Sequence, residues 1–232
     1  MAELRLLTFC VLGAFAFIWT AAAAPPAGKR KVIIDEDSFG PGTTNLQAIL
    51  LFLQTPDVDV LGITVESGDG WRDENVAHAL RLLELVQRTD VPVVPGCVYP
   101  LLNSEKETVE WEKRYGQLFY KGAWQEKFPD EGASRRTPYH GPTEVPPLPE
   151  GNPTTGPLRE AAADFLVRKV REFPHEVTIW TGGPLTNVAV ACRLDPEFAR
   201  LAKGLVMMGG SFNPPDNGTP FALEYKHSPQ LE

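Results

Sequence analysis

Three cysteines in 232 residues are too few to build a disulfide framework. Cys10 lies in an apolar leader, and the spacing of Cys97 and Cys192 fits no metal-binding motif, so we expect both to pack as small apolar residues. Basic residues are also scarce, because 22 Lys and Arg stand against 30 Asp and Glu, a formal net charge of -8. Since phosphate binding requires basic patches, this balance excludes a nucleic-acid polymer as partner.

The N-terminal apolar run, Leu6–Trp19, is shorter than the ~20 residues that a membrane span needs. It follows one early arginine and precedes a cluster of alanines at residues 21–24, which is the layout of a secretory signal. We therefore predict a signal peptide over residues 1–24 and a folded domain over 25–232, in a secreted or periplasmic protein without membrane attachment after signal removal. The alternative is a single membrane anchor.

Strand-like and helix-like patterns alternate along the rest of the chain. Strands are predicted at residues 32–35, 58–65, 91–94, 177–180 and 205–208, and helices at 46–53, 73–88, 158–172 and 185–193. Residues 105–127 are expected to be partly helical, and the many prolines and glycines of residues 128–157 predict a long irregular loop. Repeated βα units indicate an α/β fold of three layers, in which helices flank a mostly parallel sheet.

Polar and glycine residues follow the predicted strands, at the sheet edge where open parallel sheets bind ligands. Asp35 and Asp37 come at the end of the first strand, Asp69 follows the second, and "TGGPLTN" (residues 181–187) follows the fourth. Carboxylate, amide and carbonyl oxygens suit Ca²⁺ or Mg²⁺, and a carboxylate beside such a cation can deprotonate water. The alternative is that Asp37 only caps the following turn.

Several segments resemble inosine–uridine-preferring nucleoside hydrolases in their order and approximate spacing. They run from about Lys31 to Phe212 and include "VIIDEDSFGPGTTNLQAIL", "LGITVESGD", "VPVVPG", "GPLTN" followed by "LDP", and "LVMMGGSF". The resemblance implies an α/β sandwich around a mostly parallel sheet and one bound Ca²⁺. It also implies hydrolysis of the N-glycosidic bond of ribonucleosides to ribose and free base, with water that the Ca²⁺ activates.

The resemblance assigns roles to individual residues of this sequence. Asp37 matches the metal-bound aspartate that serves as general base, and Asp35 matches its supporting neighbour at the metal. The carbonyl of Thr181 or of Gly182 corresponds to a further metal ligand. Asp69 stands where many members carry an asparagine near the ribose.

The chain also departs from the family pattern after its first strand, where the loop is three residues longer. Thr44 and Asn45 stand where most members have a second pair of aspartates. Asn45 can ligate Ca²⁺ through its amide oxygen but without a formal charge, so weaker binding is expected. Thr44 can hydrogen-bond a ribose hydroxyl. Asn187 is placed with the substrate-binding residues, and its alternative is a tight turn near a helix start.

Near the end of the sequence, two alignments compete for the glutamate that binds ribose in the family: Glu224 and Glu232. The resemblance places a histidine and another metal-binding aspartate beyond residue 232, so the chain resembles a truncated member. These 232 residues alone are therefore expected to be inactive. They are also expected to expose apolar surface that favours association, for example as a homo-oligomer.

Two other functions fit parts of the sequence. A haloacid dehalogenase-like phosphotransferase would use the D-x-D after the first strand, with Asp35 as nucleophile, although "GPLTN" and "MGG" argue against it. A non-catalytic nucleoside- or sugar-binding protein would keep the site without turnover.

Overall fold

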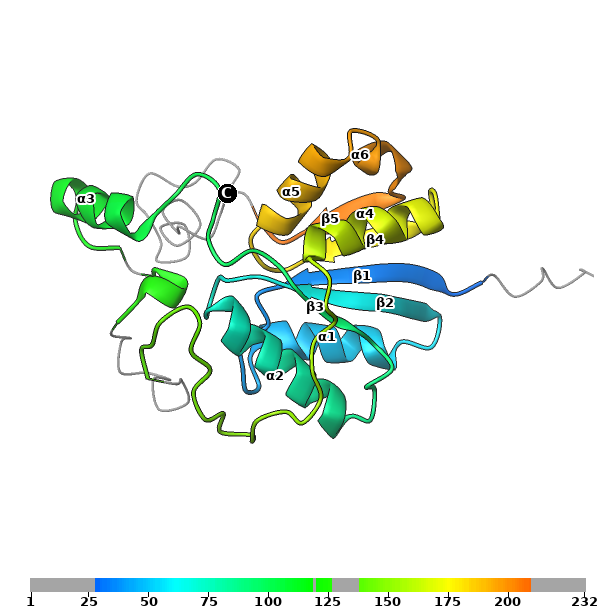
Figure 1. Cartoon of the computed structure of the whole chain (residues 1–232), viewed down its shortest axis with the longest axis horizontal. Helices are drawn as coiled ribbons and strands as arrows, with labels where there is room; N and C mark the ends of the chain where they lie inside the picture. The colour runs from blue at the N-terminus through cyan, green and yellow to red at the C-terminus, as the bar shows by residue number, and fades with distance from the viewer. Residues whose placement is uncertain (1–27, 119, 127–137, 210–232) are drawn as a thin grey trace, which may run out of the picture.

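The computed structural model describes residues 28–118, 120–126 and 138–209. Its centre is a sheet of five strands in the order β3-β2-β1-β4-β5, in which every neighbouring pair is parallel (Figure 1). The strands are β1 (Arg30–Glu36), β2 (Val58–Val65), β3 (Val93–Pro95), β4 (Val177–Thr181) and β5 (Gly204–Met207). All five predicted strands are therefore confirmed, with small differences at their ends.

Helices cover both faces of the sheet. Figure 1 shows α1 (Thr44–Gln54) and α2 (Arg72–Leu85) on one face and α4 (Ala162–Glu172), α5 (Thr186–Leu194) and α6 (Phe198–Leu201) on the other. The helix α3 (Glu105–Tyr115) and the single 3-10 turn η1 (Gly122–Trp124) lie beyond the strand ends. The predicted three-layer α/β architecture is confirmed.

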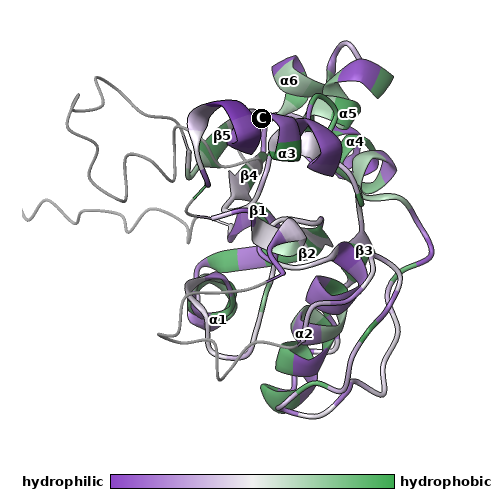
Figure 2. Ribbon diagram, turned by 90° about the vertical axis from the view of Figure 1, so that its left-hand side faces the viewer, coloured by the Kyte–Doolittle hydropathy of each residue, from purple (hydrophilic) through white to green (hydrophobic). Residues whose placement is uncertain are grey.

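Alternation along β1 divides the core into two clusters, because successive side chains of a strand point to opposite faces. Val32 and Ile34 pack with α1 and α2, whereas Ile33 packs with α4, α5 and α6. The helices match this arrangement with apolar stripes, and α2 shows both hydrophobic and hydrophilic stretches in Figure 2. Full burial of each such side chain contributes about 1.5–3 kcal/mol to stability.

One predicted helix begins later than expected, and one short helix was not predicted. The helix expected from Leu158 begins only at Ala162. The backbone N–H of Leu158 instead donates to the carbonyl of Val93 in β3 at 2.8 Å. The short helix α6 was not predicted, since its four residues are too few to show a period. Within the described residues of the irregular loop, 138–157, the structure has neither helix nor strand, as expected.

The cysteine prediction is wrong for one of the two residues. Cys97 is half-buried, but Cys192 is exposed because it lies on the outer side of α5. The signal segment lies outside the described residues. Among the helices that the structure does describe, none combines the length and apolar character that crossing a bilayer requires.

Candidate functional site

Three consecutive acidic residues lie at the carboxyl edge of the sheet: Asp35 and Glu36 end β1, and Asp37 follows directly after it. Asp35 lies in register with Thr64 of β2 and Thr181 of β4, so its side chain points to the same face as theirs. Its Oδ1 accepts hydrogen bonds from the Thr64 hydroxyl and, at 2.9 Å, from Nδ2 of Asn187. Asp35 is therefore fully buried beneath the α5 layer.

Glu36 points to the opposite face, where the first turn of α1 places Asn45. The amide nitrogen of Asn45 lies 2.9 Å from Glu36 Oε2 and 2.6 Å from Asp37 Oδ1. One buried amide thus joins the carboxylate inside the strand to the carboxylate just beyond it.

Asp37 itself is held on two sides. Asn45 contacts its Oδ1, and the backbone N–H of Asp69 donates to its Oδ2 at 2.7 Å. The loop after β2 can come this close because residue 68 is glycine, since a Cβ there would lie 2.1 Å from Asp37 Oδ2. The Asp69 carboxylate accepts a hydrogen bond from the Tyr120 hydroxyl at 2.6 Å.

A fourth buried carboxylate, Glu66, lies directly after β2, and its Oε2 accepts the backbone N–H of Asn187 at 3.0 Å. Burial raises the pKa of Asp35 to about 6 and that of Glu36 to about 7. The pKa of Asp37 is raised well above its ordinary value by burial and then by the charges of Asp69 and Glu36. The pKa of Glu66 is raised likewise, by burial and by the charges of Asp35 and Asp37.

Some oxygens of this cluster have no hydrogen-bond partner within the described residues. They are Asp35 Oδ2, Glu66 Oε1 and the hydroxyl of Thr181. No Lys, Arg or His of the described chain forms an ion pair with Asp35, Glu36, Asp37 or Glu66. Because buried carboxylates are stable as anions only beside positive charge, this donor set fits a hard cation in its chemistry.

The side chains are not arranged as a complete metal site. Across residues 28–118, 120–126 and 138–209, no three His, Cys, Asp or Glu side chains are placed to hold one ion. Asn45 also presents its NH₂ group to Asp37, and the amide must turn over before its oxygen can serve as a ligand. The types of donor atom suit a cation, but the Asn45 amide must turn before a cation can bind there.

The other sequence-predicted site residues lie around this cluster. Thr44 begins α1 but is exposed, whereas Asn187 is buried and its Oδ1 accepts the backbone N–H of Cys97 at 2.9 Å. The carbonyl of Thr181 accepts the N–H of Met208 at 2.9 Å. Glu224 and Glu232 lie outside the described residues.

Glu36 and Glu66 were missed by sequence reasoning, although both belong to the buried cluster. Glu36 stands between Asp35 and Asp37 in the sequence. Because successive side chains of a strand point to opposite faces, its side chain was not expected on the same face as theirs. Both could have been identified by the same pattern, an acidic residue at the end of a strand whose apolar sequence predicts burial.

Two hollows open beside these strand ends. One has a volume of about 390 Å³, and its lining includes Gly68, Trp71, Tyr99 and Trp124. The other, of about 290 Å³, is lined by residues that include Phe39, Asp69, Glu74 and His140. Gly68 touches Asp37, so the larger hollow adjoins the buried carboxylates.

Comparison with known proteins decides the family. The model of the inosine-uridine preferring nucleoside hydrolase family matches residues 32–225. The chain belongs to this family. Nucleoside hydrolases of this family generally depend on a metal ion, in keeping with the oxygen donors at the end of β1.

The chain is similar to named nucleoside hydrolases. It is 33% identical over 184 residues to "Probable uridine nucleosidase 2" of Arabidopsis thaliana, covering 79% of this chain and 48% of that protein. It is 31% identical over 180 residues to "Pyrimidine-specific ribonucleoside hydrolase RihA" of Salmonella arizonae, covering 78% and 48%. The solved plant nucleoside hydrolase PpNRh1 superposes with a TM-score of 0.57 at 31% identity, covering 79% and 48%. The chain thus spans about half the length of these relatives.

The family assignment and the burial of Asp35 both argue against the haloacid dehalogenase-like alternative. A nucleophilic carboxylate must reach its substrate, but Asp35 is 0% exposed and holds hydrogen bonds from Thr64 and Asn187.

Proposed function

We propose that this protein hydrolyses the N-glycosidic bond of ribonucleosides, releasing ribose and the free base, with Asp37 as the general base. The observation that carries the proposal is the placement of Asp37. It is the buried carboxylate that directly follows β1, it adjoins the larger hollow through Gly68, and the backbone N–H of Asp69 orients it. Family membership and the named nucleosidases among the relatives support the same reaction.

Asp35, Asp37 and the turned amide of Asn45 would hold the cation, which we propose to be Ca²⁺ because carboxylate and amide oxygens are its preferred ligands. A Ca²⁺ held by these residues would supply a lowered pKa for the water beside it and a fixed position for that water. Thr181 is a further candidate ligand, through the second lone pair of its carbonyl oxygen or through its unpartnered hydroxyl.

The chemical work of the chain falls on Asp37. Its carboxylate accepts the proton of the attacking water while the anomeric carbon gains positive character and the bond to the base breaks. The backbone N–H of Asp69 donates to Asp37 Oδ2 whichever way the Asn45 amide is turned, and it keeps the carboxylate aimed, as proton transfer over a short distance requires. Asp69, Thr44 and Asn187 remain our candidates for contact with ribose, together with Glu224 or Glu232.

Aromatic side chains line the larger hollow beside Asp37, and an aromatic face suits a planar base. Trp71 and Tyr99 meet there with ring centroids 6.0 Å apart. A small-molecule nucleoside is therefore the proposed substrate, and we propose that the protein acts in a secreted or periplasmic setting.

The test is ribose release from inosine, uridine, adenosine and cytidine by the full-length natural protein that carries this sequence, with Ca²⁺ at saturation. Release from at least one nucleoside is expected. Binding of nucleosides without any release would favour the non-catalytic binding protein instead. The absence of both binding and release would contradict both functions.

A further inference from the structure

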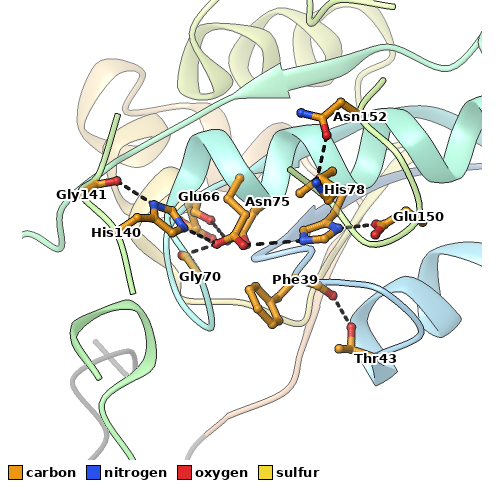
Figure 3. Close-up of polar contacts among 12 residues, drawn as sticks. Phe39, Thr43, Glu66, Gly70, Asn75, His78, His140, Gly141, Glu150 and Asn152 are labelled. Atoms are coloured by element: carbon orange, nitrogen blue, oxygen red, sulfur yellow. Dashed lines mark hydrogen bonds and ion pairs between the residues drawn. The ribbon is translucent and has the colours of Figure 1, made fainter. Parts of the chain in front are cut away.

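A second polar cluster lies against the β1–α1 loop, where His78 contacts Phe39 and Gly40. It consists of His78 of α2 and His140 and Glu150 of the irregular loop, which Figure 3 shows, together with Glu74 of α2, whose carboxylate faces both histidines. His78 Nδ1 contacts Glu150 Oε1, and His140 Nε2 lies 3.0 Å from Glu74 Oε2. His78 Nε2 faces Glu74 Oε1 at 3.8 Å, too far for a hydrogen bond.

The cluster fastens the irregular loop to α2. Besides its contact with His78, residue Glu150 accepts a hydrogen bond on its backbone carbonyl from Arg81 Nε at 3.0 Å. A second fastening lies further along the helix, where Glu84 Oε1 accepts the backbone N–H groups of Thr154 and Thr155 at 2.6 and 2.7 Å. The same stretch of loop is thus held at two places by two carboxylates.

Of these two attachments, only the contact between Glu150 and His78 extends to the β1–α1 loop, which carries Asp37. The ring of His78 packs edge-to-face against Phe39, with centroids 5.5 Å apart. It also lies directly against Gly40, where a Cβ would come within 2.5 Å of His78 Nδ1. His78 is fully buried, so Glu150 on one side and the β1–α1 loop on the other leave its ring no room to turn.

From Phe39 and Gly40 the contact continues to the site. The Thr43 hydroxyl donates to the carbonyl of Phe39, which closes the loop just before α1 begins. Asn45, two residues later, donates to Asp37 at 2.6 Å. A shift of Phe39 or Gly40 would therefore move Asn45 relative to Asp37.

We propose that His78, fixed by Glu150, is a positioning residue that sets the β1–α1 loop and with it the contact between Asn45 and Asp37. The inference rests on the function proposed for Asp37, but its test does not require turnover. Loss of the Glu150 carboxylate would leave His78 Nδ1 buried without a partner, and the ring would turn to find one. The loop that lies against the ring would follow.

Hydrogen exchange measured on peptides covering residues 38–48 tests the proposal, because the Gln47 amide there donates to Thr43 O at 3.1 Å. Glu150→Ala should speed exchange in these peptides by about tenfold, the effect expected when a hydrogen bond to a charged group is lost. Glu150→Gln, which can still accept from His78, should restore most of the protection. Calorimetry should show the weakest Ca²⁺ binding in Glu150→Ala, with Glu150→Gln closer to the wild type.

Glu84→Ala is the matched control, because it releases Thr154 and Thr155 from the same helix but keeps the contact of Glu150 with His78. It also removes the partner of Arg81, so it tests the Arg81 bond to the Glu150 carbonyl separately from the Glu150 carboxylate. It should speed exchange around residues 153–156 and leave residues 38–48 unchanged. The proposal is overturned if Glu150→Ala leaves residues 38–48 as in the wild type, or if Glu84→Ala loosens them equally. Absence of Ca²⁺ binding in the wild type would count against the proposed function, while the exchange data would still decide this inference.

Discussion

The amide nitrogen of Asn45 lies 2.6 Å from Asp37 Oδ1, so an uncharged donor occupies the position that faces the proposed general base. The same nitrogen also lies 2.9 Å from Glu36 Oε2. This amide supplies part of the positive potential that the two buried carboxylates need. It is also the group that must turn when a cation binds.

Asn45→Asp should tighten Ca²⁺ binding by roughly tenfold or more, because a charged oxygen replaces a neutral ligand. It should also destabilise the metal-free protein, since a third carboxylate would replace the donor between Glu36 and Asp37. Calorimetric titration and thermal unfolding measure the two effects. Asn152→Asp is the control, because it makes the same change at an exposed position of the irregular loop, where either side chain can accept the Leu148 N–H, and it should change neither quantity appreciably. Weaker binding in Asn45→Asp would show that Asn45 is not a ligand.

Asp35→Asn should act on metal affinity more than on chemistry, because Asp35 lies inside β1 and cannot reach a substrate. We expect weaker Ca²⁺ binding and, with Ca²⁺ at saturation, a kcat within about tenfold of the wild type. Asp59→Asn removes a charge from an exposed position of β2 and controls for net charge. A large loss of kcat that Ca²⁺ does not restore would place Asp35 in the reaction itself.

Without metal, stability should fall as the pH rises through the titration of the buried carboxyls. The pKa values of Asp35 and Glu36 are about 6 and about 7 when folded, against ordinary values of 3.8 and 4.5. A carboxyl whose pKa is raised by folding stabilises the protein fully below its unfolded pKa, and this contribution is lost as the pH rises through the folded pKa. The window thus runs from about pH 4 to pH 7.

Denaturant unfolding in a chelating buffer, repeated across this window, measures the effect. The midpoint should fall with rising pH in chelator, and Ca²⁺ should reduce or reverse the fall because the cation favours the charged carboxylates. A midpoint that rises with pH in chelator would contradict the assignment of these raised pKa values.

Gly68→Ala should disturb Asp37 directly, because the added Cβ would lie 2.1 Å from Asp37 Oδ2. We expect a loss of about 1–3 kcal/mol in the free energy of unfolding, as for other overpacked sites, together with weaker Ca²⁺ binding. Gly141→Ala is the control, since no other group lies within 4 Å of its added Cβ. Unchanged Ca²⁺ affinity in Gly68→Ala would show that Asp37 does not contact the ion.

The sequence predicted the sheet and most helices because β-branched runs and helical apolar spacing are local signals. It located Asp35 and Asp37 for a similar reason, since carboxylates at the end of a buried strand are visible without knowledge of the fold. The resemblance also placed Asn45 beside these aspartates, but the sequence could not show that Asn45 faces Asp37 with its nitrogen, because that depends on how the longer loop packs.

The burial of Glu36 and Glu66 beside the two aspartates was equally invisible in the sequence. Each lies at the end of a different strand, and only the register of β1 with β2 brings them to the same edge. His78 lies in a helical pattern that does not reveal its surroundings, and the structure buries it fully against Glu150. Its partner lies 72 residues away in the chain, beyond the reach of any local pattern.

The most direct test of the account is the kcat of Asp37→Asn on the best nucleoside, measured in the full-length natural protein with Ca²⁺ affinity determined alongside. Asparagine keeps the shape of the side chain but cannot accept the proton of water. At saturating Ca²⁺, kcat should fall by roughly a hundredfold to ten-thousandfold, the range that general-base catalysis contributes. A kcat equal to that of the wild type would contradict the role of Asp37 and the mechanism built on it.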